Sequence, residues 1–237
     1  PPGPPHRARR GRHPPAAPGA DGRAPSGRIQ AAMLTFHDLA CTKGERFLFQ
    51  GVHCTLERGH WLQVAGANGM GKTSLLRLVC GLSVPARGDV RWDGTPIATL
   101  GDAWRRQLLY IGHDSGVQGL LTARENLRVA ATLSGLAPTE DDLADALSRL
   151  GLRARADLPA RVLSQGQKRR VALARLALSP VPVWVLDEPF VAIDGEALGL
   201  LSALIGAHLD RGGLAVLTSH QPVELGGRPG HRLELGR

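Results

Sequence analysis

A glycine-rich segment ending in a lysine and two hydroxyl residues is the first feature that could do chemistry. It reads Gly66-Ala67-Asn68-Gly69-Met70-Gly71-Lys72-Thr73-Ser74. Glycines let such a loop turn its backbone N–H groups toward phosphate oxygens at a helix N-terminus. At this spacing the lysine reaches the β- and γ-phosphates of a nucleoside triphosphate, and the next hydroxyl is placed for Mg²⁺. The segment therefore predicts a phosphate site, with Lys72 on the phosphates and Thr73 on the metal.

Two adjacent acids in the second half of the chain form the next candidate group. Asp187 and Glu188 follow the apolar run 183–186, which is typical of a parallel strand buried on both faces. Ligands bind at the carboxyl ends of strands in open α/β sheets. We expect Asp187 to complete the magnesium shell and Glu188 to polarise the attacking water. The alternative is a surface acidic pair after a strand.

The elements that must position these groups are visible in the hydrophobic pattern. Residues 61–65 alternate and end in small residues, which predicts a strand leading into the glycine loop. Apolar residues at 75, 76, 78 and 79 have helical spacing, so a helix should follow the loop. The order strand, glycine loop, helix is the context that the phosphate site requires.

A five-residue segment, Leu163-Ser164-Gln165-Gly166-Gln167, narrows the class of protein. Ser164 lies 23 residues before Asp187, and a helix that is first basic and then apolar should follow over residues 168–178. With the two phosphate-site motifs in this order, the chain resembles the ATP-binding subunits of ABC transporters, whose signature is LSxGQ. The resemblance implies ATP and Mg²⁺ as ligands. It also implies an α/β fold, a P-loop NTPase of the ABC ATPase type, with a helical subdomain and a small antiparallel β subdomain.

Further family elements follow in register. Residues 190–194 resemble the D-loop, with Asp194, and residues 217–220 resemble the segment that ends in the switch histidine, His220. In the family this histidine contacts the γ-phosphate, and the signature of one subunit closes over the P-loop of another. The resemblance therefore implies a homodimer in which residues 163–167 contact the partner's ATP, so that one copy supplies half of each site.

Helix signals replace strand signals over about residues 115–162, where the family has its helical subdomain. Thr122 and Glu125 have capping-box spacing, and Thr139 begins a second predicted helix. Acids at 140–142 suit the positive end of that helix, with contact to a partner as the alternative reading. In the family, the groove beside this subdomain receives a coupling helix from a membrane subunit.

Two positions depart from the common family pattern. Counting back from Leu121 and Thr122, the Q-loop glutamine position holds His113, which implies a different magnesium contact. The aromatic residue that usually stacks on adenine falls, by a looser count, near Lys43, with Arg46 and Phe47 close by.

Short accessory stretches indicate the subfamily. Residues 109–113, 121–127, 166–176 and 217–222 are similar to the haem-exporter ATPase of bacterial cytochrome c maturation, and the likeness covers about residues 33–235. It implies a peripheral subunit on the cytoplasmic face of the inner membrane, paired with a multi-span permease and other cytochrome c maturation subunits. Its ATPase activity would power haem export or release of a haem-loaded chaperone. Two alternatives remain: an ABC ATPase subunit for another substrate, and a soluble ABC-type ATPase acting on nucleic acid or ribosomes.

The composition of the chain argues against several classes of function. The chain has 237 residues, 43% hydrophobic and 4% aromatic, which suits one compact domain with some tail. Its three cysteines have no CxxC spacing, so neither a disulfide framework nor a cysteine zinc site is expected. The charge-free apolar stretch 197–209 is too short to cross a bilayer. Its nine histidines include no CxxCH motif, so this subunit is not expected to bind haem.

The net charge of +8 is concentrated at the N-terminus. Residues 1–32 hold six arginines and one acid, which is +5, and leave +3 for residues 33–237. That proline-rich segment has too few large apolar residues to offset the entropy of ordering, so we expect disorder there. Two readings are open: a start assigned upstream of the true one at Met33, or a basic arm for anionic lipid or nucleic acid. The resemblance implies that residues 33–237 form an ABC ATP-binding domain, and no nucleic-acid partner is expected for the chain.

Overall fold

The structure is a computed structural model that describes residues 1–3 and 33–236. Most of the basic N-terminal segment, residues 4–32, lies outside the described residues, so the expectations for it stay predictions. Over residues 33–236 the chain is α/β, as predicted, with one parallel and one antiparallel sheet.

A five-stranded parallel sheet forms the centre, in the order β6-β7-β8-β3-β9. Its middle strands are covered on both faces, which explains their continuous apolar sequences. In β7, Val183 and Val185 pack into one hydrophobic core, whereas Trp184 and Leu186 pack into the other. The strands are β3 (Trp61–Ala65), β6 (Leu108–Ile111), β7 (Val183–Leu186), β8 (Leu214–Thr218) and β9 (Gly230–Glu234).

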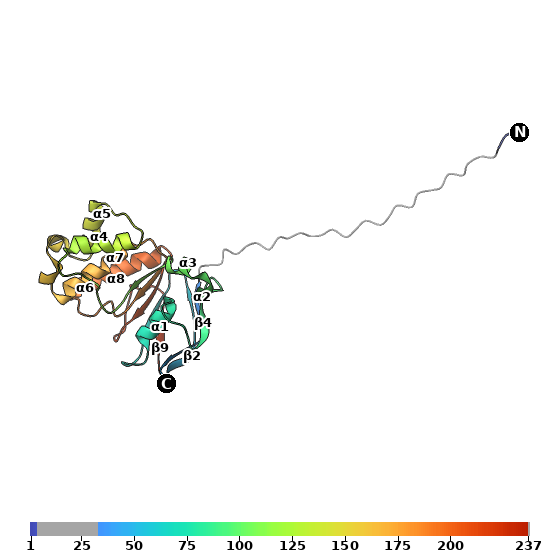
Figure 1. Cartoon of the computed structure of the whole chain (residues 1–237), viewed down its shortest axis with the longest axis horizontal. Coiled ribbons are helices and arrows are strands. Elements are labelled where there is room, and N and C mark those ends of the chain that lie inside the picture. Colours follow the sequence, from blue (N-terminus) through green and yellow to red (C-terminus); the bar gives the residue numbers. More distant parts are fainter. Residues whose placement is uncertain (4–32, 237) are drawn as a thin grey trace. The chain divides into compact units, whose positions relative to one another are not determined.

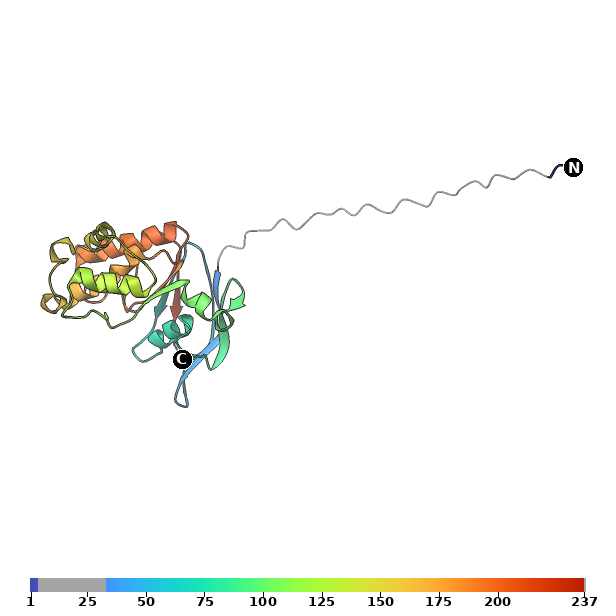
Figure 2. The same cartoon turned by 45° about the horizontal axis from the view of Figure 1, so that its top comes forward.

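The second sheet is antiparallel and has the order β2-β1-β4-β5. Its buried face, including Leu34 and Phe36, shares one core with α1 and with alternate residues of β7 and β8. Figures 1 and 2 show α1 close to the antiparallel strands. The elements of this part are β1 (Met33–Lys43), β2 (Arg46–Glu57), α1 (Lys72–Val79), β4 (Arg87–Trp92), β5 (Thr95–Pro96), α2 (Ile97–Leu100) and α3 (Asp102–Arg105).

The remaining helices gather on the other side of the molecule (Figure 1). They share the second core with the opposite faces of β7 and β8. They are α4 (Ala123–Leu133), α5 (Glu140–Ser148), α6 (Gln165–Leu173), α7 (Arg175–Leu178) and α8 (Gly195–Asp210), with 3-10 turns at Arg153–Arg155 and Ala160–Val162. No helix among the described residues is long and apolar enough to span a bilayer.

The predicted starts of α4 and α5 are confirmed, and one other helix differs from the prediction. Thr122 caps α4 and Thr139 caps α5, each through a capping box. The single helix expected over residues 168–178 is two helices, because α6 ends and α7 begins on either side of Ala174.

Candidate active site

The glycine loop lies between β3 and α1, as expected. Lys72 is the first residue of α1 and is 7% exposed; its Nζ donates to the carbonyl oxygens of Gly66, at 2.8 Å, and Ala67, at 3.4 Å. The amino group therefore lies over the loop at the positive end of α1, where a phosphate group would bind.

Two glycines of the loop leave little or no room for a side chain. At Gly66, which has φ 135°, an added Cβ would lie 2.5 Å from the carbonyl oxygen of Leu235. At Gly71, with φ 95°, it would lie 3.0 Å from the side chains of Leu48 and Phe49. The loop thus needs glycine both for its left-handed backbone and for its close packing.

Thr73 and Asp187 meet although they are far apart in sequence. The Thr73 Oγ1 donates to Asp187 Oδ2 at 2.8 Å, while Thr218 Oγ1 donates to Asp187 Oδ1 at 2.7 Å. Asp187 is 2% exposed and Thr218 is fully buried. Mg²⁺ prefers hard oxygen ligands and is commonly held by one or two protein groups together with phosphates. A hydroxyl and a carboxylate fixed side by side fit that requirement.

Glu188 occupies a left-handed turn directly after β7, with φ 49°. Its Oε1 lies 2.9 Å from His220 Nε2, and its Oε2 lies 3.9 Å from His113 Nδ1. The Glu188 side chain is 20% exposed, so it is open to the solvent that a hydrolase must use. The carboxylate is therefore flanked by both histidines that the sequence singled out.

The loop that holds His220 is fixed by polar contacts on both sides. Gln63, buried in β3, donates from Nε2 to the carbonyl oxygen of Gln221 at 2.7 Å. Ser219 Oγ donates to the same carbonyl oxygen and accepts from the Gln221 N–H. His220 thus projects from an anchored turn at the end of β8.

The signature segment forms the start of α6. Ser164 caps the helix: its Oγ accepts from the Gln167 N–H at 3.1 Å, and Gln167 Oε1 accepts from the Ser164 N–H at 2.9 Å. Leu163 is buried, whereas Ser164 and Gln165 are exposed. A Cβ at Gly166 would lie 2.3 Å from the carbonyl oxygen of Ala192, so α6 packs directly on the predicted D-loop.

Asp194 has a local role that the sequence reasoning missed. Its Oδ1 accepts from the Ala197 N–H at 2.8 Å and caps α8, and its Oδ2 lies 3.5 Å from Arg170 Nη2. The signal was present, because an aspartate before a long apolar helix is a common N-cap.

Two further residues near the acids were not singled out from the sequence. Thr218 Oγ1 accepts from the Glu188 N–H at 2.7 Å, and Arg169 donates to backbone carbonyls beside His113 and Glu188. A hydroxyl in an otherwise apolar strand was the available signal for Thr218. For Arg169, within a basic run, the sequence offered none.

The side chains predicted near the adenine base lie on β1 and β2. Lys43 ends β1, Arg46 begins β2, and Phe47 is half-exposed on β2. The choice among these side chains for the base stays a prediction.

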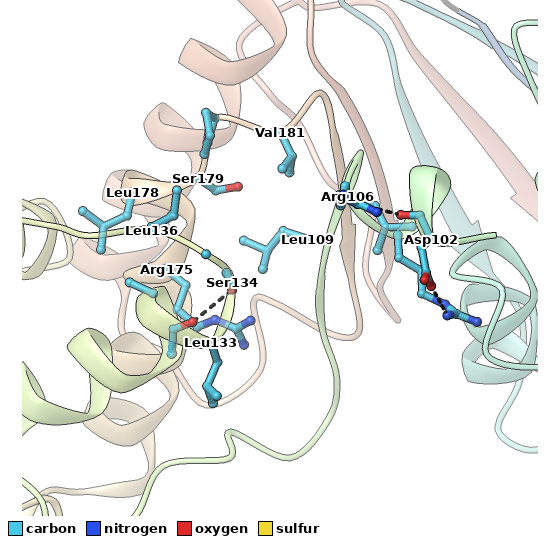
Figure 3. Close-up of a pocket in the computed structure, with 16 residues that line it drawn as sticks. Asp102, Arg106, Leu109, Leu133, Ser134, Leu136, Arg175, Leu178, Ser179 and Val181 are labelled. Carbon is cyan, nitrogen blue, oxygen red and sulfur yellow. Dashed lines mark hydrogen bonds and ion pairs between the residues drawn. The ribbon is translucent and has the colours of Figure 1, made fainter. Parts of the chain in front are cut away.

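A hollow of ≈ 760 Å³ lies between α4, the C-terminal end of α7 and the start of β6 (Figure 3). Apolar side chains line one part of it, including Leu133, which is 84% exposed. Three arginines, two serines and Asp102, which pairs with Arg105, line other parts of it. Burial lowers the pKa of one of these arginines, Arg175. The lining side chains labelled in Figure 3 include Leu109, Leu136, Leu178, Val181 and Arg106.

Known proteins resemble this chain along most of its length. The model of the ABC transporter family matches residues 49–191. A protein of Albidiferax ferrireducens described as cytochrome c biogenesis ATP-binding export protein CcmA is 54% identical over 202 residues, which is 85% of this chain and 96% of that protein. One with the same description from Nitrosospira multiformis is 50% identical over 84% of this chain and 96% of its own length. A solved putative ABC transporter ATP-binding protein from Pyrococcus furiosus superposes with TM-score 0.75 at 26% identity, covering 86% of this chain and 97% of that one. The chain therefore belongs to the ABC transporter family of ATP-binding proteins, and within it to the cytochrome c biogenesis ATP-binding export proteins.

Proposed function

We propose that this chain is the ATP-hydrolysing subunit of a bacterial ABC transporter complex for cytochrome c maturation, powering haem export or release of a haem-loaded chaperone. The observation that supports it most is the convergence of Lys72, Thr73, Asp187, Glu188 and His220 at one edge of the parallel sheet, in a chain with close relatives of that description.

Each of these residues has a defined part in the proposed reaction. The loop N–H groups and Lys72 bind the β- and γ-phosphates. Thr73 and Asp187 would hold Mg²⁺, which neutralises charge on the phosphates when bound. Glu188 accepts a proton from the attacking water, and His220, 2.9 Å from its Oε1, orients the carboxylate and contacts the γ-phosphate.

The signature requires a second copy of the chain. Ser164 and Gln165 are exposed at the N-terminus of α6, and the tip of the phosphate loop, residues 67–69, is exposed as well. Two chains that meet head to tail would cover both surfaces and complete two sites by symmetry. We infer a homodimer that ATP stabilises and that hydrolysis releases.

The hollow beside α4 supports a membrane partner. Its exposed leucine and its arginine-lined wall offer both apolar area and positive charge to a helix of the permease (Figure 3). We infer that the subunit works at the cytoplasmic face of the inner membrane, held there by the permease and other cytochrome c maturation subunits.

Glu188→Gln tests the chemistry directly. Glutamine keeps the shape of the glutamate side chain but cannot accept the proton of the attacking water. ATP turnover should therefore fall at least roughly a hundredfold, while ATP still binds and the ATP-bound dimer accumulates. Lys72→Ala should instead weaken ATP binding. ATPase rates, nucleotide binding and ATP-dependent dimerisation measure the difference, and the exposed Glu57→Gln serves as the matched acid-to-amide control.

A second arm tests the biological assignment. In cells lacking their own copy, the wild-type chain should restore c-type cytochromes and Glu188→Gln should not. Wild-type turnover by Glu188→Gln would place the base elsewhere. Normal c-type cytochromes in the Glu188→Gln strain, with another solute failing to cross, would reject the haem pathway and keep the ABC assignment.

A further inference from the structure

A buried arginine on the signature helix joins three separate segments of the site. Arg169 lies on α6 and is 7% exposed. Its Nη1 donates to the backbone carbonyl oxygens of Gly112, at 2.7 Å, and His113, at 3.3 Å. Its Nη2 donates to those of Asp187 and, at 3.3 Å, Glu188. One side chain thus contacts the loop after β6 and the turn after β7 from the helix that starts with the signature.

The chemistry of these contacts requires an arginine. All four acceptors are neutral carbonyl oxygens, and only a planar guanidinium presents enough N–H groups in a fixed fork to reach them together. Burial lowers the pKa of Arg169, with the nearby charges of Asp187 and Glu188 opposing that shift. Burying a charge is unfavourable unless it is well hydrogen-bonded, so the position has a reason beyond filling space.

The turn that Arg169 holds is the one with the proposed base. Glu188 has a left-handed backbone, which a non-glycine residue adopts only where its surroundings enforce it. Thr218 on β8 accepts a hydrogen bond from the Glu188 N–H. From the α6 side, Arg169 donates to the carbonyl oxygens of Asp187 and Glu188. The turn is therefore supported by the sheet on one side and by the signature helix on the other.

We propose that Arg169 is a positioning residue that makes the signature helix, the His113 loop and the Glu188 turn move as one unit. Closure of the signature on the partner's ATP would then set the position of the hydrolytic carboxylate in the same chain. This inference rests on the proposed ATPase function and deepens it, because it names what links dimer closure to hydrolysis.

Arg169→Met tests this link. The phosphate loop and the exposed signature residues stay intact, so KM for ATP should remain within about twofold while kcat falls at least roughly tenfold. In the Glu188→Gln background, ATP-dependent dimerisation should persist. Lys168→Met is the matched control: it removes a charge from the adjacent position of α6, and within the described residues the Lys168 side chain makes no hydrogen bond or ion pair. It should keep the wild-type kcat.

Two more variants separate positioning from general stability. Arg169→Lys keeps a buried cation but loses the fork, so its kcat should lie between those of wild type and Arg169→Met, and it serves as the test if the methionine variant does not fold. Thr218→Val removes the other support of the same turn. The double variant should lose less than the product of the two single losses in kcat, because both act on one element. ATPase rates are compared at a temperature at which circular dichroism shows that every variant is folded.

The outcomes divide clearly. Any one of four results would overturn the inference. The first two concern Arg169→Met alone: a wild-type kcat, or a rise in KM that accounts for the whole loss of activity. The other two are loss of ATP-dependent dimerisation in the Glu188→Gln background and multiplicative losses of kcat when Arg169→Met is combined with Thr218→Val. Those results leave the proposed function intact so long as the wild-type chain hydrolyses ATP. A wild-type chain without ATPase activity would instead reject the proposed function itself.

Discussion

Glu188, the proposed base, lies between two histidines, and one of them, His113, departs from the family pattern. The spacing of the sequence predicts that His113 occupies the Q-loop position, which usually holds a glutamine. In the structure His113 Nδ1 lies 3.9 Å from Glu188 Oε2. A glutamine offers an amide oxygen and an amide nitrogen, whereas a histidine offers two ring nitrogens. With His220 on the other carboxylate oxygen, the proposed base is placed between two imidazoles.

A third histidine, which is not part of the site, should control stability in acid. His208 on α8 is 4% exposed and stacks on Trp184, with ring centroids 3.8 Å apart. Burial lowers the pKa of His208 from 6.5 to about 4, and Arg211 adds to the shift, although a hydrogen bond to Leu214 opposes it. The unfolded chain takes up this proton first as pH falls. The free energy of unfolding should therefore be constant above about pH 6.5 and decrease from there to about pH 4, by on the order of 3 kcal/mol.

His208→Phe removes this titration while keeping an aromatic ring against Trp184. Its stability near neutral pH should be lower, because the hydrogen bond to Leu214 is lost, but the decrease between about pH 7.5 and about pH 4.5 should be smaller than in wild type. Urea unfolding at the two pH values measures it. The exposed His231→Asn should keep the wild-type decrease, and an undiminished decrease in His208→Phe would assign the acid sensitivity to another group.

Residues with a chemical motif could be assigned candidate roles from sequence, whereas residues that support them could not. Lys72 and Thr73 are defined by their neighbours in the chain, so spacing alone identifies them. Thr218 and Arg169 contact Glu188 although they lie 30 and 19 residues away from it in the sequence. Their contacts exist only once β7, β8 and α6 are packed together, which no local pattern encodes.

At the scale of elements, features that depend on neighbouring residues were predicted correctly, whereas features that depend on tertiary packing were not. Each capping box, at Thr122 and at Thr139, depends on four consecutive residues. The sequence predicts the box at Thr122 and, at Thr139, the start of the helix. The break between α6 and α7 follows no proline or glycine and was missed. Leu133 has helical spacing with the apolar residues of α4 yet is 84% exposed, because it borders the hollow proposed for the membrane partner.

The close packing of α6 on the predicted D-loop gives a prediction at this scale. In Gly166→Ala the new Cβ would lie 2.3 Å from the backbone carbonyl oxygen of Ala192, so one of the two segments must move. We expect kcat to fall by more than about tenfold with KM for ATP nearly unchanged, and the free energy of unfolding to fall by about 1–3 kcal/mol. Steady-state ATPase kinetics and urea unfolding measure both effects.

Gly199→Ala is the control for this substitution. Gly199 lies within α8, and an added Cβ there would have no heavy atom within 4 Å. Alanine is the better helix former, so this variant should gain about 0.5–1 kcal/mol and keep its activity. Equal activity of Gly166→Ala and Gly199→Ala would show that the contact between α6 and the D-loop does not matter for turnover.

At the scale of the whole molecule, the arrangement of the two exposed surfaces predicts how sites are shared. The exposed tip of the phosphate loop and the exposed start of α6 belong to different elements of the fold. If each site combines the phosphate loop of one chain with the signature of its partner, two differently damaged chains can restore one site between them. Sites contained within one chain cannot be restored in this way.

Mixing Lys72→Ala with Ser164→Arg chains tests that arrangement. Each variant alone should be inactive, since every site of its homodimer contains one damaged part. In a mixed dimer, the intact phosphate loop of the Ser164→Arg chain meets the intact signature of the Lys72→Ala chain. With random pairing, half of the dimers then have one good site of two, so an equal mixture should recover up to about a quarter of the wild-type ATPase rate.

A second mixture makes this prediction specific. Lys72 and Glu188 belong to the same half of a site, because Thr73 and Asp187 join the phosphate loop to the turn with Glu188 within one chain. Lys72→Ala mixed with Glu188→Gln should therefore recover nothing, since every site has either a damaged loop or a damaged base. Recovery in both mixtures would mean that subunits reassemble into sites of another composition. Recovery in neither would place the signature and the phosphate loop of each working site in the same chain.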